Sequence, residues 1–146
     1  MSKKVIGFNL VGIDTKEFAT FEEVFDSSDK ANIDLDLNIG FQLSENLDII
    51  NCIFTITFSQ NNNVFIKLKL SCSFKLEETT INSFKKDQEI IFPKHLMSHF
   101  GVITIGTARG VLHSKTDGSI FNDLILPTIN LTEMIKDDII FDLDQA

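Results

Sequence analysis

The chain has 146 residues, and its 13 basic against 21 acidic residues give a net charge of −8. This acidity argues against nucleic acid as a partner, because phosphates would repel the surface, and the length fits a single domain, residues 1–146, that folds without disulfides. No signal peptide and no run of about 18 apolar residues is present, so we expect a cytoplasmic protein without membrane insertion.

The first apolar run, from Val5 to Ile13, is rich in residues that favour strands and predicts a first β-strand. A phenylalanine-containing acidic segment at 18–25 and a polar, loop-like stretch at 26–31 follow it. Val5 and Val11 share one face of this strand, because side chains alternate along it. We expect these two valines to contribute to an interface between copies of the chain.

Three segments in the middle of the chain, 32–43, 50–58 and 64–76, alternate apolar and polar residues with a period of two. This period predicts antiparallel strands that bury one face and leave the other in water. Together with the first strand, they predict a four-stranded sheet.

The short loops between these strands indicate how the strands pair, since residues directly opposite in an antiparallel pair share a face. A loop over 44–47 predicts Phe41 opposite Ile50, and the next loop sets Cys52 directly across from Cys72. We expect both cysteines to be reduced, buried thiols that pack as small apolar side chains. The alternative is a redox switch formed by the two.

The water-facing side of the predicted sheet carries both charges and large apolar residues. The predicted outward residues are Asp34, Asp36, Lys67 and Lys69, together with Ile49, Ile53 and Phe65. Such a mixture is typical of a surface for unfolded chain or for a partner subunit. Of the two, we favour contact between subunits.

A polar stretch over 77–89 is interpreted as a linker, and the apolar stripe after it predicts a long helix from Pro93 to about Thr116. Gly118 is the natural residue to end this helix. Gly106 and Gly110 lie four apart on one helix face, where a missing side chain lets another backbone come close. We expect them at a tight contact with the sheet or with a second helix, and the alternative is that they are glycines tolerated in a buried helix.

The segment after this helix predicts an extended apolar crossing over 119–126, a turn at Pro127 and a short helix over 131–136. Asn130 followed by Glu133 matches a helix N-cap with its reciprocal carboxylate.

The last segment, 137–146, alternates acidic and apolar residues. It predicts an added strand, with an acidic docking tail or a frayed end as alternatives. A run of strands followed by two helices indicates an α+β domain with the helices on one side of the sheet.

Groupings that could carry chemistry are scarce. His95 and His99 are four apart on the predicted helix, a spacing that can place two imidazoles on one metal. The third candidate ligand, His113, lies about five turns beyond His95 along the helix, so no metal is expected. The sequence has no phosphate-binding glycine loop and no nucleophile motif. We therefore expect no cofactor and no enzymatic activity.

The last third of the chain has a distinctive order: a proline-led long helix, a glycine-containing crossover, a leucine-proline-x-asparagine element and a short helix. Its residues are Phe92, Pro93, Gly118, Leu126, Pro127, Ile129 and Asn130, with an Arg-Gly step at Arg109 and Gly110 within the long helix. In these motifs, and in element order over most of its length, the chain resembles the SecB family of protein-export chaperones and its divergent SecB-like members.

The resemblance implies a SecB-like α+β fold, a four-stranded antiparallel sheet with one long and one short helix packed on one face. It also implies an ATP-independent holding chaperone that binds non-native polypeptide in apolar grooves and assembles as a homo-oligomer, a dimer or tetramer. Candidate client-binding residues are Ile49, Ile53, Phe65, Phe92, Phe121 and Leu126, and candidate oligomer-interface residues are Gly106, Gly110, Val5 and Val11.

The client implied is an export precursor or, as for some SecB-like proteins, an antitoxin. SecB proteins dock on a translocation motor through an acidic sheet face, which Lys67 and Lys69 would interrupt here. Two other functions stay open. One is a non-catalytic oligomeric scaffold that uses its apolar surface in self-assembly, and the other is a carrier of a small ligand in a cavity lined by Phe54, Leu68 and Ile103.

Overall fold

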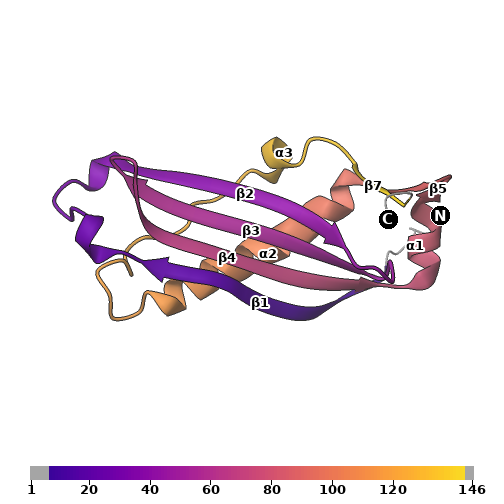
Figure 1. Cartoon of the computed structure of the whole chain (residues 1–146), viewed down its shortest axis with the longest axis horizontal. Coiled ribbons are helices and arrows are strands. Elements are labelled where there is room, and N and C mark those ends of the chain that lie inside the picture. Colours follow the sequence, from indigo (N-terminus) through magenta and orange to yellow (C-terminus); the bar gives the residue numbers. More distant parts are fainter. Residues whose placement is uncertain (1–6, 144–146) are drawn as a thin grey trace.

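The computed structural model describes residues 7–143 and contains a four-stranded antiparallel sheet in the order β1-β4-β3-β2. Its strands are β1 (Phe8–Thr20), β2 (Ile33–Leu43), β3 (Ile49–Gln60) and β4 (Asn63–Leu76). The long helix α2 (Lys94–Lys115) runs across one face of this sheet (Figure 1). The predicted α+β fold, with a four-stranded antiparallel sheet and a long helix, is confirmed.

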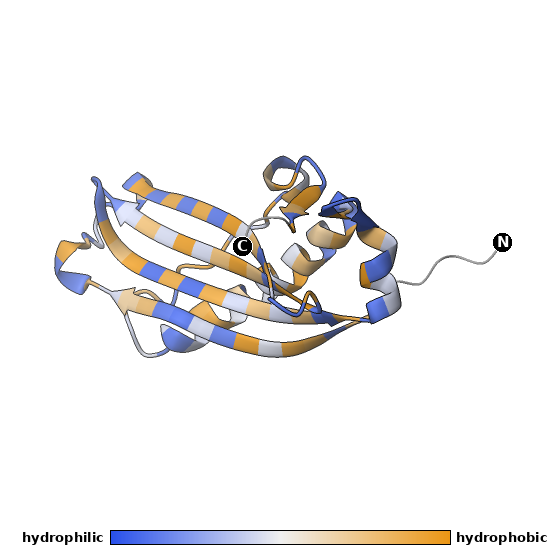
Figure 2. Ribbon diagram, turned by 45° about the vertical axis from the view of Figure 1, so that its right-hand side comes forward, coloured by the Kyte–Doolittle hydropathy of each residue, from blue (hydrophilic) through white to orange (hydrophobic). Residues whose placement is uncertain are grey.

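The alternation of residues along the strands decides which face of the sheet is core. In β3, Ile50, Cys52, Phe54 and Ile56 are fully buried, whereas the residues that alternate with them stay partly exposed. Figure 2 shows the same alternation as coloured bands along the strands. Because successive side chains of a strand point to opposite faces, one face packs under α2 and the other stays open.

The first strand differs from its prediction in length. β1 continues to Thr20, into the acidic, phenylalanine-containing segment that was expected to follow the strand, while Val5 lies outside the described residues. Two single turns of 3-10 helix, η1 (Glu22–Val24) and η2 (Lys30–Asn32), then lead to β2. The side-chain amide of Gln60 donates to the backbone carbonyls of Asp26 and Asp29, at 3.0 and 2.9 Å, and ties this connection to the end of β3.

The strand registers were predicted correctly for one hairpin and wrongly for the other. Cys52 faces Cys72 across β3 and β4, as predicted. Phe41 faces Cys52, two residues from the predicted Ile50, which pairs with Leu43 instead. A slip of two residues keeps every side chain on its own face, so the hydrophobic pattern cannot detect it. The turn decides the register, and its Leu47 adopts a positive φ of 61°.

Phe65 lies in the core, although it was predicted on the water-facing side. The β3–β4 register shifts by one between Phe58 and Ser59, so that Phe65 is the extra residue of a β-bulge. The bulge turns its side chain to the helix side, where it is fully buried. Its ring centroid lies 4.6 Å from that of Phe25 and 5.4 Å from that of Phe121.

The long helix begins and ends where the sequence predicts. Pro93 occupies the N-cap position of α2, Thr116 the C-cap, and Gly118 follows with a φ of 76°. The buried stripe of α2 packs on the sheet through Phe100, whose ring stacks 4.2 Å from Phe74 with an interplanar angle of 12°.

The close approach to α2 occurs at a different glycine from the two predicted. A Cβ on Gly101 would lie 3.1 Å from the Leu131 side chain and 3.2 Å from that of Ile39. Gly106 and Gly110 are exposed, and a Cβ at either position would meet nothing within 4 Å. The expectation of a tight contact at these two glycines with the sheet or another helix of the same chain is therefore wrong. Gly101 is the glycine that lets β2 and the short helix pack against α2.

A second, small structure occupies the stretch that was predicted to be a linker. Helix α1 (Glu78–Phe84) leads into β5 (Lys85–Lys86) and β6 (Glu89–Phe92), and β7 (Ile139–Asp142) completes an antiparallel sheet in the order β5-β6-β7. The added C-terminal strand is confirmed, and it joins this small sheet rather than the main one. Phe92 anchors the unit, with its ring 5.6 Å from Phe84 and 5.7 Å from Phe141.

The crossover between the two C-terminal helices is less extended than predicted. Residues 119–123 form turns, and only 124–130 run without regular structure to α3 (Leu131–Met134). The Asn130 side chain accepts the backbone N–H of Thr132 at 3.1 Å, which confirms the N-cap, although among the described residues Glu133 makes no reciprocal bond. Arg109 of α2 donates to the carbonyls of Leu126 and Pro127, at 3.1 and 3.0 Å, and holds the crossover to the helix.

Both cysteines are free and fully buried, as predicted. The pKa of the Cys52 thiol is raised to about 12, mainly by burial and to a smaller extent by the nearby Cys72, while a hydrogen bond with Thr104 acts in the opposite direction. A thiol that stays protonated at neutral pH is a poor nucleophile. The arrangement therefore disfavours the redox switch.

The glycine contacts predict opposite effects of substitution along α2. Gly106→Ala should raise the free energy of unfolding by up to about 1 kcal/mol, because alanine favours a helix and meets open space here. Gly101→Val should lower it by about 1–3 kcal/mol, because its methyl groups would overlap Leu131 and Ile39. Denaturant unfolding measures both. A destabilised Gly106→Ala protein would contradict the exposed placement of that glycine.

The buried Cys52 predicts a pH dependence at alkaline pH. Its ordinary pKa of 9.0 applies to the unfolded chain and about 12 to the folded one, so only the unfolded state ionises between these values. The stability that the neutral thiol contributes is complete below about pH 9 and is lost as the pH rises toward 12. Denaturant unfolding at a series of pH values should show a steeper loss in the wild type than in Cys52→Ala.

Candidate functional site

The six predicted client-binding residues do not form one surface. Phe65, Phe92, Phe121 and Leu126 are at most 2% exposed and belong to the core. Only Ile49 and Ile53 are accessible, and both are half-buried on the open face of β3. The apolar residues near the crossover are buried because they, together with α2, cover the helix side of the sheet. The outward position predicted for Phe65 is therefore wrong, and the burial of the other three leaves no exposed side chain for a client to contact in this conformation. Client binding at Ile49 and Ile53 stays a prediction.

The open face of the main sheet separates its charges by strand. Asp34 and Asp36 lie on β2, whereas Lys67 and Lys69 lie on β4, with the uncharged side of β3 between them. Glu17 of β1 forms an ion pair with Lys67 at 2.9 Å. This contact lowers the pKa of the exposed Glu17 carboxyl. The face is thus acidic along β2 and basic along β4.

A row of partly exposed apolar side chains follows β2, on the helix side of the sheet. The apolar residues of β2 on that side are all only half-buried: Ile33, Leu35, Leu37, Ile39, Phe41 and Leu43. At Ile39–Phe41 this row borders a hollow of about 570 Å³, whose other wall is the connection 133–139. We call this row and the hollow together the β2 groove. The volume of the hollow is in the range of small-ligand pockets.

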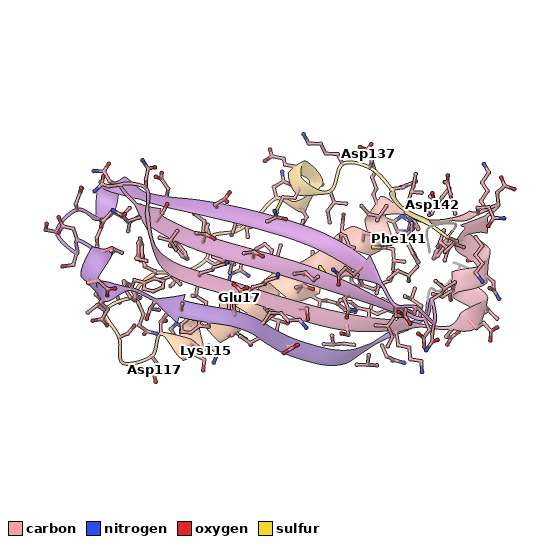
Figure 3. The ribbon with its side chains drawn as sticks, viewed as in Figure 1. Glu17, Lys115, Asp117, Asp137, Phe141 and Asp142 are labelled. Atoms are coloured by element: carbon pink, nitrogen blue, oxygen red, sulfur yellow. The ribbon has the colours of Figure 1, made fainter. Side chains whose placement is uncertain are left out.

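The lining of the hollow is uncharged on the strand side, whereas the connection on the other side contributes both apolar and charged residues, of which most are acidic. Met134 and Ile139 face the strand residues, and Glu133, Asp137 and Asp138 outnumber the one cation, Lys136. Asp138 accepts the backbone N–H of Lys94 at 2.8 Å and so fixes the connection to the start of α2. Figure 3 shows Asp137 between α3 and β7, at the upper rim of the molecule, on the side of β2.

A second hollow, of about 580 Å³, lies on another side of the same connection. The first turn of α2 contributes Lys94, His95 and Ser98, and the remaining lining comes from 132–136. Because Glu133, Ile135 and Lys136 line both hollows, this connection forms a narrow bridge with open space on two sides.

The groove residues Ile39, Phe41 and Met134 were not predicted as a site. Alternation along β2 shows that its apolar residues face inward, but not that β2 is an edge strand with incomplete cover. The strand order that makes β2 an edge depends on β1 pairing with β4, a contact between distant parts of the chain.

A second exposed apolar area lies along β1 and α2. Leu10, Val11 and Ile13 of β1 are 42–55% exposed, and Val102 of α2 is 59% exposed. We call these four residues the β1/α2 patch. The strand follows the helix for most of its length, since the Phe8 ring lies 5.5 Å from the His99 ring and the Phe18 ring 5.6 Å from the Lys115 ammonium.

The predicted oligomer-interface residues can be placed relative to this patch. Val11 belongs to it, and Gly106 and Gly110 are exposed on the same helix as Val102. Val5 is outside the described residues. An oligomer interface at these positions stays a prediction.

Within residues 7–143, no cluster of three or more His, Cys, Asp or Glu side chains could hold a metal ion. None of the helices in that range combines the length and the apolar character needed to cross a bilayer.

Fold and site together define an α+β protein with a half-buried apolar row along one edge of its main sheet and exposed apolar side chains along the other. Further exposed apolar side chains, among them Ile125 and Ile140, lie away from both edges. No protein-family model and no curated protein matches the sequence. A solved SecB-like chaperone of Mycobacterium tuberculosis, in complex with a peptide from the HigA1 antitoxin, is similar over 84% of this chain and 90% of that one, with a TM-score of 0.49 and 9% identity. A similarity this remote assigns neither a family nor a function.

The burial difference between two predicted client-binding residues predicts distinct mutant stabilities. Phe65→Ala should lower the free energy of unfolding by about 3–5 kcal/mol, because it removes a fully buried ring from the phenylalanine cluster. Ile53→Ala should cost roughly 1 kcal/mol, since its side chain is half in solvent. Denaturant unfolding of the two variants compares them. Equal, small losses would contradict the bulge that places Phe65 in the core.

Proposed function

We propose that this protein is an ATP-independent holding chaperone that binds non-native polypeptide in the β2 groove. The observation that supports this best is the β2 edge itself: eleven residues of strand whose apolar side is only half covered and opens into a hollow. An extended segment laid along this edge would complete the missing cover.

The energetics of such binding suit reversible holding. Apolar burial contributes roughly 25 cal/mol per Å², and the entropy lost in ordering a flexible segment offsets much of it. Release of the client by dissociation then needs no nucleotide. Charge adds a preference for basic segments, because Asp34 and Asp36 lie on the open face of the same edge strand and Glu133 and Asp137 line the hollow.

Both client types that the sequence resemblance implies, an export precursor and an antitoxin, present unfolded segments that this groove would take. A translocation motor that needs a uniformly acidic sheet face fits the open face less well, because Lys67 and Lys69 lie between the acids of β2 and β1. We therefore propose unfolded polypeptide as the principal partner.

The β1/α2 patch supports a second candidate function, a non-catalytic oligomeric scaffold. Exposed large apolar side chains on neighbouring elements are typical of surfaces that contact another protein. In this function a dimer or tetramer would bury the patch, and no apolar surface would remain for a client. The same patch is compatible with a chaperone that is itself an oligomer.

Light-scattering mass on a sizing column, with and without an equimolar reduced and unfolded client protein, tests the proposal. We expect the chain to co-elute with the client and to suppress its aggregation. Met134→Ser and Phe41→Ser, which remove apolar surface from the hollow, should weaken both effects by several-fold. Ile120→Ser is the matched control, because it removes an exposed apolar side chain from the turn after α2.

Thermal unfolding of each variant confirms that it is folded at the assay temperature. An oligomer that ignores every unfolded client would replace the chaperone with the scaffold. Equal weakening by Ile120→Ser and Met134→Ser would show binding that does not use the β2 groove.

A further inference from the structure

The two edges of the main sheet differ in a way that bears on how a client binds. β1 shows two register shifts against β4, one between Leu10 and Gly12 and one between Thr15 and Glu17. Bulges of this kind twist and interrupt an edge strand, and proteins use them to prevent another strand from pairing there. β2 pairs with β3 without any shift from Ile33 to Leu43. It is the regular edge of the sheet.

The outer backbone of β2 is free to pair. Within residues 7–143, no backbone hydrogen bond joins Ile33–Leu43 to any segment other than its hairpin partner β3. A straight edge strand with unpaired N–H and C=O groups is a template for an additional strand. Helices and folded surfaces cannot satisfy such a row of groups, whereas an extended polypeptide can.

The side chains of β2 specify what that added strand would carry. Asp34 and Asp36 project from the open face, and their cross-strand neighbours on β3 are Ser59 and Thr57, which bring no positive charge. Neither carboxylate is in an ion pair with a described residue. In an added strand, the residues opposite these two would lie on the same face, with Cβ atoms about 4.5–5.5 Å away. Basic side chains there would be paired.

The alternate positions of the added strand face the other way. They would meet Ile33, Leu35 and Leu37, the half-buried side chains of the groove, and continue the apolar layer of the helix side. Farther along, the strand reaches Ile39 and the hollow, which has room for a larger apolar side chain. Five residues along Ile33–Leu37 span about 17 Å.

We propose that the client segment binds as an additional β-strand on the outer edge of β2, with basic and apolar side chains in strict alternation. This inference rests on the proposed holding function and gives the bound conformation and the pattern that function would select. The feature that discriminates between clients is the order of residues along the segment. The same residues in another order would place basic side chains in the groove and apolar side chains in water.

Fluorescence anisotropy with short labelled peptides and the full chain tests the pattern. The first peptide alternates lysine with valine or isoleucine over nine residues, and the second has the same composition with the lysines grouped in one block. We expect the alternating peptide to bind at least tenfold more tightly. Two variants of the alternating peptide, with backbone N-methyl groups at the odd or at the even positions, test the main-chain pairing. At least one of them should lose the tenfold gain in affinity.

A pair of charge reversals tests the position on the sheet. Asp36→Lys should weaken the alternating lysine peptide at least fivefold and strengthen an otherwise identical glutamate peptide. Asp117→Lys is the matched control, because it makes the same change in net charge in the turn after α2. Figure 3 shows Asp117 near the β1 edge of the sheet, opposite the β2 edge. The control should leave the preference for lysine over glutamate unchanged.

The outcomes separate this inference from the function on which it rests. In one outcome, the unfolded client protein binds, while the peptide with grouped lysines and the N-methylated peptides bind as well as the alternating one. That result overturns strand addition and leaves the holding function in place. If Asp36→Lys and Asp117→Lys act equally, the pairing with β2 is overturned in favour of overall charge. If neither the peptides nor any unfolded client binds, the proposed function itself fails.

Discussion

The structure depends on the burial of one face of β3 and β4 beneath α2. These two central strands supply most of the fully buried side chains of the sheet, and α2 covers them with a stripe that includes Phe100 and Thr104. The helix covers the middle of the sheet better than its edges. The apolar residues of β1 and β2 on the same side are therefore left partly exposed, and both candidate binding surfaces of the molecule arise from this incomplete cover.

The close packing of α3 and β2 on α2, which positions the groove, depends on Gly101. Because Gly101 has no side chain, Leu131 of α3 and Ile39 of β2 can both approach the first half of α2. Asp138, bound to the start of the same helix, then directs the chain from α3 back toward β6. The connection between these two points forms one wall of the hollow, and the end of β2 forms the other. The groove is thus built where a helix, a strand edge and a returning segment converge.

The sequence determines the faces of the strands and the ends of the long helix, because period-two alternation and capping residues are local signals. It does not determine pairing that involves a bulge or a two-residue slip. Phe65 was misplaced for the first reason and the partner of Phe41 for the second. The candidate site was missed for a third reason, since incomplete cover of β2 is a property of strand order and helix position. Accordingly, four of the six expected contact residues are parts of the core.

The pairing of β6 with β7 has a consequence for biosynthesis. Strand β6 precedes α2, and its partner Ile139–Asp142 follows α3, so the loop between them contains the whole helix and the crossover. During synthesis, Asp142 must therefore have left the ribosomal exit tunnel before the connection 133–139 can be held at both ends. The four strands of the main sheet emerge long before that. During translation the β2 edge is available for pairing while one wall of its hollow is still missing, and the nascent chain cannot capture its own strands in a finished groove.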